Sequence, residues 1–379
     1  MKKCISLIIT VGIFIAFSNT TSRAAQPKQL ETGESAPDFN LPCIDGKNHK
    51  LADYSNSDIL VVIFTCNHCP TAQAYEERII KLTDDYKDKS VAVVAISPND
   101  PKAVRLDELG YTDLGDSLED MRIRAKQKGF NFPYLFDGDT QSVSRLYGPV
   151  STPHVFIFDK QRKLRYVGRI DDSENPVNIK SHDTRNAIEE LLAGKKVSVT
   201  KTRTFGCSIK WADKRDSAKR ALERWASEDV TLEMIDAAGI KKIVANKTDK
   251  LLLVNVWATW YSPCVAEFDE LVTINRMYRK RDFQLVTISA DSPDRKNKVL
   301  DFLKDKQASF TNYLFDSENK YTLMEAVDEK SPGGIPYTIL IKPGGEIIYR
   351  QLGLIEPLEL KNIIVEQLGR YYFKAENSG

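Results

Sequence analysis

Two cysteines separated by two residues stand directly after a run of apolar residues. Cys66 and Cys69 belong to the segment TCNHCP (65–70), which follows the apolar run ILVVIF (59–64). Such a run predicts a strand buried on both faces, and residues 68–86 read as the helix that follows it. A thiol at a helix start meets unpaired backbone N–H groups and the positive end of the helix dipole, which favour an anion. The pattern therefore predicts a reactive dithiol.

The chemistry expected of this pair is thiol–disulfide exchange. Placement at the helix start can lower the pKa of a thiol from about 8.5 to roughly 3.5–7.5, so Cys66 is the predicted nucleophile. Cys69, one turn later, would attack the mixed disulfide and release the reduced substrate. His68, as a cation or hydrogen-bond donor, would stabilise the Cys66 thiolate and make the disulfide more oxidising.

Cys66 and Cys69 allow two other interpretations. A zinc site needs further ligands at suitable spacing, but the chain has no second Cys-x-x-Cys and its four histidines are scattered, so neither a metal nor a cofactor is expected. A buried, permanently oxidised disulfide would instead make the chain a non-catalytic binding protein. Rapid alkylation of Cys66 after mild reduction would distinguish an enzyme from such a protein.

The second half of the chain repeats this plan. The apolar run LLLVNVW (251–257) leads into ATWYSPC (258–264), and a helix is expected to about residue 279. In each half a proline, Pro153 or Pro336, later opens another apolar strand. Strands alternate with helices in both halves, and each half ends in a strand pair and a helix. The pattern predicts two tandem α/β folds, each a mixed central sheet flanked by helices.

The first half resembles the redoxin (alkyl-hydroperoxide-reductase-like) branch of the thioredoxin-like superfamily. The resemblance rests on APDFNLP (36–42), FTCNHCP (64–70), STP (151–153) and GRIDD (168–172), and covers roughly residues 30–212. It implies that Pro153 is a cis-proline facing the disulfide and that Thr152 presents its backbone to substrate, with Asn67 also binding substrate. It implies protein thiols and disulfides as clients, with an unidentified redox partner. With His68, a potential above the about −270 mV of thioredoxin is expected.

The second half resembles thioredoxin-like thiol reductases of the TlpA type, over about residues 228–372. The pattern expected there is Trp-Cys-x-Pro-Cys, whereas this chain has WYSPC (260–264). Tyr261 takes the nucleophile's place and Cys264 remains alone, so dithiol exchange within this domain is excluded. With Pro336, these residues form a degenerate site, and the domain is expected to be a binding module.

Peroxide reduction is the alternative enzymatic interpretation, because relatives of redoxins include peroxiredoxins. Their pattern, Pro-x-x-x-Thr-x-x-Cys, does not fit. Counted back from Cys69, the Thr and Pro positions hold Cys66 and Val62; counted back from Cys66, they hold Ile63 and Ile59.

Two more cysteines lie outside these motifs. Cys207, in FGCSIKW (205–211), follows the last helix expected in the first domain, and Cys43 lies in LPCIDG (41–46). Three interpretations stay open: Cys207 is a third redox thiol that reaches Cys66, it forms a structural disulfide with Cys43, or it is free.

The ends of the predicted domains complete the organisation. Residues 1–25 carry two lysines, an apolar stretch and small residues before a cleavage site, as in a secretory signal peptide. A periplasmic or secreted protein is expected, without a stable membrane span after cleavage; the alternative is an uncleaved signal that anchors the protein. Domains are expected at 30–194 and 229–372, joined by a basic linker with a short helix at 195–228. The linker is expected to be solvated, or to dock an acidic partner or the other domain. The formal charge of +1 argues against nucleic-acid binding.

Overall fold

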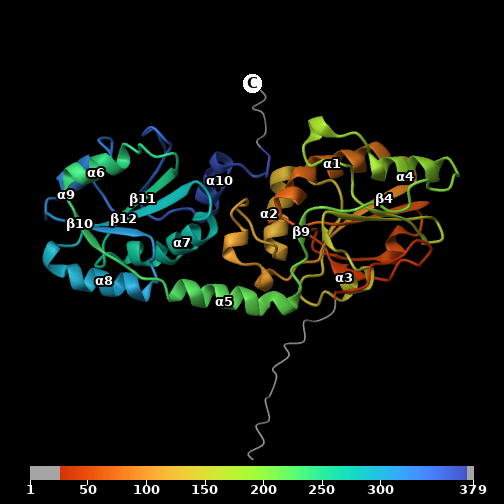
Figure 1. The fold of residues 1–379 in the computed structure, drawn as a ribbon, viewed down its shortest axis with the longest axis horizontal. Helices are drawn as coiled ribbons and strands as arrows, with labels where there is room; N and C mark the ends of the chain where they lie inside the picture. Colours follow the sequence, from red (N-terminus) through yellow and green to blue (C-terminus); the bar gives the residue numbers. More distant parts are fainter. Residues whose placement is uncertain (1–25, 374–379) are drawn as a thin grey trace, which may run out of the picture.

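Two α/β units lie side by side in the computed structural model, which describes residues 26–373 (Figure 1). Each unit has a mixed β-sheet flanked by helices, which confirms the fold class expected from the sequence. The expected signal peptide, residues 1–25, lies outside the described residues. Among residues 26–373, no helix combines the length and the apolar character needed to cross a membrane.

The first unit contains a five-stranded sheet in the order β5-β4-β3-β7-β8 and a β1–β2 hairpin. Its strands are β1 (Asn40–Pro42), β2 (Asn48–Lys50), β3 (Ile59–Phe64), β4 (Val91–Ser97), β5 (Tyr134–Phe136), β6 (Ser151–Thr152), β7 (His154–Phe158) and β8 (Leu164–Gly168). Its helices are α1 (Pro70–Tyr86), α2 (Leu118–Lys128), α3 (Ser142–Tyr147) and α4 (Asp183–Leu192). Central β3 pairs parallel with β4 and antiparallel with β7, and all six of its residues are buried, as its apolar run predicts.

The second unit contains a six-stranded sheet in the order β10-β13-β12-β11-β14-β15. Its strands are β10 (Glu233–Ile235), β11 (Leu251–Trp257), β12 (Phe283–Ser289), β13 (Thr311–Phe315), β14 (Tyr337–Ile341) and β15 (Ile347–Leu352). Its helices are α6 (Ala237–Val244), α7 (Ser262–Tyr278), α8 (Lys296–Asp305), α9 (Lys320–Val327) and α10 (Pro357–Leu368). Strand β11 pairs with β12 and β14 as β3 pairs with β4 and β7.

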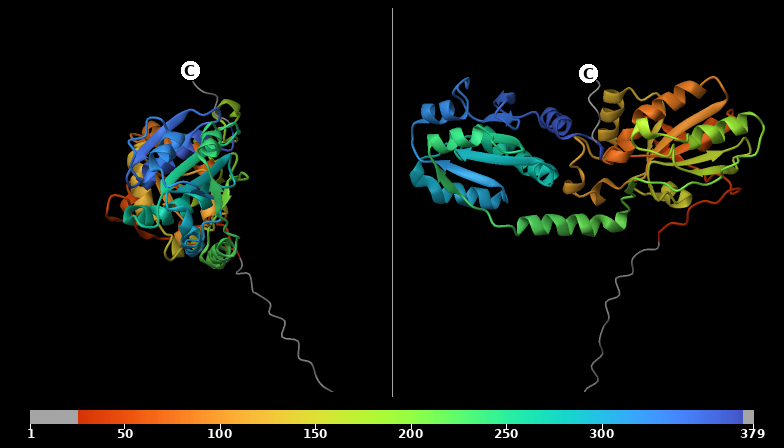
Figure 2. Two further views of the ribbon diagram at one scale, coloured as in Figure 1. Left: turned by 90° about the vertical axis from the view of Figure 1, so that its left-hand side faces the viewer. Right: turned by 45° about the horizontal axis from the view of Figure 1, so that its top comes forward.

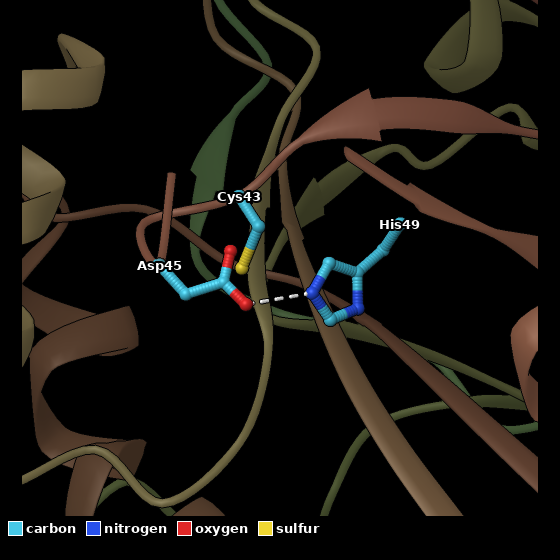
Figure 3. A group of neighbouring side chains, drawn as sticks. All are labelled: Cys43, Asp45 and His49. Carbon is cyan, nitrogen blue, oxygen red and sulfur yellow. Dashed lines mark hydrogen bonds and ion pairs between the residues drawn. The ribbon is translucent and has the colours of Figure 1, made fainter. Parts of the chain in front are cut away.

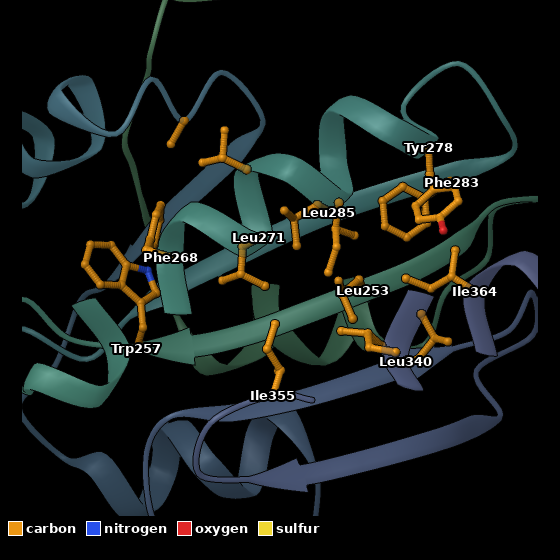
Figure 4. Packing of buried hydrophobic residues seen from close by; sticks show 14 of the residues in the cluster. Leu253, Trp257, Phe268, Leu271, Tyr278, Phe283, Leu285, Leu340, Ile355 and Ile364 are labelled. Carbon is orange, nitrogen blue, oxygen red and sulfur yellow. The ribbon is translucent and has the colours of Figure 1, made fainter. Parts of the chain in front are cut away.

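In each unit, packing of apolar side chains holds the helix that follows the central strand against the sheet. In the second unit, Figure 4 shows Leu253 and Trp257 of β11 facing Phe268 and Leu271 of α7. The ring centroids of Trp257 and Phe268 lie 4.7 Å apart. In the first unit, the buried face of α1 packs on the sheet in the same way. The first turn of each helix is therefore held at the end of its central strand.

The segment between the units is more structured than expected. It adds strand β9 (Cys207–Ser208), which pairs with β6, and helix α5 (Arg215–Ala226), which bridges the two units (Figure 2). Trp211 is 2% exposed, and Lys210 is buried in an ion pair with Glu108 at 2.6 Å. The expectation of a solvated linker is therefore wrong for its middle, because these side chains complete the first unit.

Direct contacts also join the two units. Arg370, just after α10, makes an ion pair with Asp113 of the first unit at 2.7 Å, and both side chains are buried. The Tyr278 hydroxyl donates to the carbonyl oxygen of Thr112 at 2.8 Å, and Arg281 donates to that of Gly110 at 2.6 Å. These contacts bring the end of the second unit close to α1 and the loop before α2 (Figure 1).

Candidate functional site

The loop between β3 and α1 carries the two cysteines of the Cys-x-x-Cys motif. Helix α1 begins at Pro70, and Cys69 is its N-cap residue. Cys66 lies three residues earlier, in the loop. We expected Cys66 at the helix start, and the structure corrects this: Cys69 is the N-cap residue and Pro70 takes the first helical position.

Both sulfur atoms contact the loop before β7. The Sγ of Cys66 lies 3.1 Å from the Thr152 hydroxyl, and the Sγ of Cys69 lies 3.4 Å from the Thr152 carbonyl oxygen. The bond between Thr152 and Pro153 is cis, in agreement with the expectation from the resemblance. The motif and the Thr152–Pro153 pair, far apart in sequence, therefore meet at one place.

Cys207 is the third sulfur at this place. Its strand β9 pairs antiparallel with β6, so that Cys207 stands opposite Thr152. The backbone N–H of Cys207 donates to the Sγ of Cys69 at 3.3 Å. The structure thus brings Cys207 to Cys69, whereas from the sequence we considered Cys66 as its partner.

The backbone of Thr152 is already paired with another strand of the same chain. We expected Thr152 to present its backbone edge to a bound substrate, but in the structure β9 occupies it. Gly206 makes the close approach possible: its φ is +126°, and a Cβ there would lie 2.0 Å from the Thr152 carbonyl oxygen. The chain's own strand takes the place expected for a client.

The dithiol is not open to solvent. Cys66 is 3% exposed and Cys69 is fully buried, whereas Cys207 is partly exposed. An accessible Cys66 was expected, and this expectation is wrong. Strand β9 packs against the two sulfurs, and the hydroxyl of Tyr372 lies 3.9 Å from the Sγ of Cys207.

Asp116, a buried acid that we did not predict from the sequence, holds the loop between β3 and α1. Asp116 accepts hydrogen bonds from the backbone N–H of Asn67 at 2.9 Å and of His68 at 3.1 Å. The Nδ1 of His68 donates to Asp116 at 2.5 Å, and the Asn99 amide donates to it at 2.8 Å. Asp116 comes from the long loop before α2, and no motif marks it; its only signal is an acid in a loop that follows a parallel strand.

The charges around the sulfurs favour Cys69 as the thiolate. Burial alone would raise the pKa of the Cys69 thiol, but hydrogen bonds from the thiols of Cys207 and Cys66, and the charge of His68, bring it well below its usual range. Burial and the hydrogen bond to Cys69 raise the pKa of Cys66 well above its usual range. His68 is buried, which lowers its pKa, but Asp116 reverses the effect and raises it. The group expected to be the thiolate, Cys66, is therefore the donor.

Asn67 makes hydrogen bonds within the protein, whereas we expected its side chain to bind substrate. Its side chain is 1% exposed and donates to the Gly115 carbonyl oxygen at 2.8 Å, while it accepts from the Tyr134 hydroxyl at 3.4 Å. These contacts hold the cysteine loop against the loop that carries Asp116. The side chain does not line a surface that a substrate could reach.

Cys43 belongs to a separate group of side chains. Figure 3 shows it beside Asp45 and His49, whose Nε2 lies 2.9 Å from the Asp45 carboxylate. The other ring nitrogen of His49 lies 3.0 Å from the hydroxyl of Tyr54. Thiol, carboxylate and imidazole are donors that zinc accepts, as are Cys66, His68 and Asp116. In each group the histidine already bonds to the carboxylate, and Cys43 and Cys207 belong to different core clusters.

The corresponding place in the second unit lacks this chemistry. Helix α7 begins at Ser262 with Tyr261 as its N-cap residue, and Tyr261 is 38% exposed. Cys264 lies inside the first turn and is fully buried, and burial raises the pKa of its thiol to about 12. The bond before Pro336 is cis, as is the bond before Pro153. The second unit thus repeats the central strand, the helix start and the cis-proline, but its sulfur at this place, that of Cys264, is buried and protonated.

Comparisons with known proteins found relatives that each match about half of this chain or less. Thiol-disulfide oxidoreductase ResA of Geobacillus thermodenitrificans is 24% identical over 178 residues, which are 46% of this chain and 87% of that protein. A Mycobacterium tuberculosis protein named as a candidate peroxiredoxin is 30% identical over 115 residues, which are 30% of this chain and 61% of that protein. The structure of an uncharacterized conserved protein from Geobacillus kaustophilus is 35% identical and covers 49% of this chain and 95% of its own, with a TM-score of 0.44.

The family model described as AhpC/TSA family matches residues 32–167 and 227–350, more than half of the chain. The first match contains β3, α1 and Pro153, and the second contains β11, α7 and Pro336. The chain therefore belongs to the AhpC/TSA family.

Proposed function

We propose that the chain is an extracytoplasmic thiol–disulfide oxidoreductase whose redox couple is Cys66 and Cys69. The observation that carries the proposal is a buried sulfur at a helix N-cap, with a second thiol three residues earlier and, between them, a buried histidine paired with Asp116. The chemistry of such a thiolate is nucleophilic attack on a disulfide sulfur. The similarity to ResA supports the same activity.

The structure favours Cys69 as the sulfur that carries the negative charge in the reduced state. It receives hydrogen bonds from two thiols and a backbone N–H, and His68 supplies the nearby positive charge. Stabilising the reduced form makes the disulfide more oxidising, so a potential above about −270 mV remains our proposal.

The second unit is proposed as a redox-degenerate module that binds clients. Trp260 and Tyr261 are 47% and 38% exposed at the end of β11, where a thiol would otherwise stand. Leu352 is also exposed, and the N–H of Gly353 next to it donates to the carbonyl oxygen of Pro336 at 2.9 Å. The exposed apolar side chains at this end of the sheet suit an extended, apolar segment of a protein.

The central test is a redox titration of the full chain with thiols counted by mass spectrometry. We expect one disulfide, between Cys66 and Cys69, to form and break reversibly, and the protein to reduce a model protein disulfide. The variant Cys264→Ser is the matched control, because it removes an equally buried thiol from the second unit and should change neither result. Unchanged exchange in the Cys66→Ser, Cys69→Ser double variant would refute the proposal.

Export is tested separately. Residues 1–25 fused to a reporter enzyme that is active only outside the cytoplasm should give activity, and replacing Lys2 and Lys3 by Glu should reduce it. A fusion protein that is made but shows no reporter activity would overturn the extracytoplasmic part of the proposal alone.

Peroxide reduction is the second candidate, and two observations favour it. The Mycobacterium tuberculosis relative is named as a candidate peroxiredoxin. The sulfur of Cys69 is buried, so a small oxidant reaches it more easily than a protein does. Adding hydrogen peroxide to the reduced protein distinguishes the two functions. Rapid formation of a sulfenic acid on Cys69 would support a peroxidase, and a slow reaction with rapid disulfide exchange would support the oxidoreductase.

A further inference from the structure

The burial of the dithiol raises the question of how electrons leave it. Cys66 is 3% exposed and Cys69 is fully buried, so a client protein cannot contact either sulfur in this conformation. Cys207 is the member of the cluster that is partly exposed. A reaction with a large disulfide therefore needs either an opening of the site or a third sulfur that connects it to the surface.

Strand β9 holds Cys207 in position for the second possibility. Pairing with Thr152 fixes its backbone, and Gly206 lets the strand lie close to the Thr152 carbonyl group. The N–H of Cys207 donates to the Sγ of Cys69 at 3.3 Å, and the Cys207 side chain packs against the cluster of Cys66 and Cys69. The inner side of Cys207 thus faces Cys69.

The outer side of Cys207 faces the second unit. The hydroxyl of Tyr372 lies 3.9 Å from its sulfur, and the Tyr372 ring packs edge-on against Tyr111 with centroids 5.0 Å apart. Tyr372 is 59% exposed and follows α10, so this wall lies at the junction of the two units. The surface beside Cys207 is therefore built by residues of both units.

We propose that Cys66, Cys69 and Cys207 form a three-sulfur relay in which Cys207 exchanges with the client and Cys69 links Cys207 to Cys66. This inference rests on the proposed function and adds a catalytic residue to it. It also changes the partner expected for Cys207, because the order of the sulfurs from the surface inwards is Cys207, Cys69 and Cys66.

The relay balances in electrons and protons. Cys207 gives its proton to the Cys69 thiolate and attacks one client sulfur; the client S–S bond breaks, one client thiolate leaves, and a Cys207–client disulfide forms. Cys69 then loses that proton to the departing thiolate and attacks Cys207, so the Cys69–Cys207 bond forms and the second client sulfur leaves. Finally Cys66 attacks Cys69 and returns its proton to Cys207. Two electrons pass from Cys66 and Cys69 to the client, whose remaining thiolate takes a proton from water.

The relay predicts an intermediate that can be trapped. In the Cys66→Ser variant of the full chain, mild oxidation should form a disulfide between Cys69 and Cys207, which mass spectrometry of tryptic peptides identifies. The double variant Cys66→Ser, Cys264→Ser is the control and should give the same linkage. Formation of only intermolecular disulfides, or no linkage of Cys207, would overturn the proposal.

The variant Cys207→Ser separates the relay from the proposed function. Its rate of reducing a protein disulfide should fall about 10-fold or more, while redox titration should still show the Cys66–Cys69 disulfide. An unchanged rate would overturn the relay and leave the proposed function standing. Loss of the Cys66–Cys69 disulfide and of exchange in the unmodified chain would instead refute the proposed function.

Discussion

The loops that follow β3 and β11 are built alike but differ in chemistry. Each leads from a buried central strand to the N-cap of a long helix, and each is held by an aspartate from a distant loop. Asp116 accepts from the N–H groups of Asn67 and His68, and Asp291 accepts from the N–H of Thr259 at 2.8 Å. The N-cap residue is Cys69 in the first unit and Tyr261 in the second.

The comparison shows what makes a sulfur reactive in this frame. Burial raises the pKa of a thiol in both units, and it prevails for Cys264, which has no cation beside it. For Cys69 the effect is reversed by two donating thiols and by His68. The fold therefore supplies the place, and the residues around the N-cap decide whether a thiolate forms there.

The largest expected difference between the units is in exchange activity. Replacing Cys69 by serine should reduce the rate of disulfide reduction by about 100-fold or more, because the Cys66–Cys69 disulfide can no longer form. Replacing Cys264 by serine should change the rate less than about 2-fold, since the group lies in the core of the other unit. A stopped-flow assay with a fluorescent protein disulfide measures both. A similar loss in both variants would show that the second unit is not redox-degenerate.

The junction of the units should account for the next largest effect. Arg370→Met leaves the buried carboxylate of Asp113 without its closest cation and should reduce the free energy of unfolding by about 3 kcal/mol. Urea denaturation measures this, and the control Lys81→Met removes an ion pair that is exposed, with an expected change below about 0.5 kcal/mol. If the two variants lose equal stability, the units are not joined through this ion pair.

Much of this frame could be predicted from the sequence, because its strongest signals are local. The apolar runs at 59–64 and 251–257 became β3 and β11, and the bond before Pro153 is cis as expected. Strand β13 was missed because its sequence, TNYLF, contains Asn312 at a buried position, where it bonds with Thr287. Burial of a polar residue by a specific partner leaves no periodic signal.

The details of the site depended on contacts between distant segments. Nothing in the sequence connects Asp116 with His68, or Cys207 with Cys69, because each pair is joined only by the fold. The helix start was misplaced for a smaller reason: the helix begins at Pro70, and this boundary shift of two residues puts Cys69 and not Cys66 at the N-cap.

The aspartates that hold the two loops allow a sharper comparison. Burial would raise the pKa of Asp116, but His68 lowers it, and the pKa of His68 is raised in turn. A raised histidine pKa stabilises the fold below about pH 6.5, and the effect is lost as pH rises through the folded value. A lowered aspartate pKa stabilises it above about pH 4, and the effect is lost as pH falls through the folded value. The pair is therefore fully effective between these limits.

Asp116→Asn should remove the charge on His68 near neutral pH and thereby raise the pKa of the Cys69 thiol. The absorbance of the thiolate at about 240 nm, followed against pH, should shift to higher pH, and exchange at pH 7 should slow by about 10-fold. The matched variant Asp291→Asn removes the equivalent anchor from the second unit and should leave the thiolate titration unchanged. Equal shifts in both variants would mean that the effect comes from loosened folding and not from the charge on His68.

The smallest expected effect is a gain of function in the second unit. Tyr261→Cys creates a Cys-x-x-Cys motif with Cys264, at the helix position that Cys69 has in the first unit. In a chain that also carries Cys66→Ser and Cys69→Ser, we expect a disulfide to form on oxidation but exchange to recover only to about 1% of the original rate, because no histidine cation lies between the new thiols. Tyr261→Ser in the same background is the control and should recover nothing. Recovery close to the original rate would show that position alone, without His68 and Asp116, makes the N-cap thiol reactive.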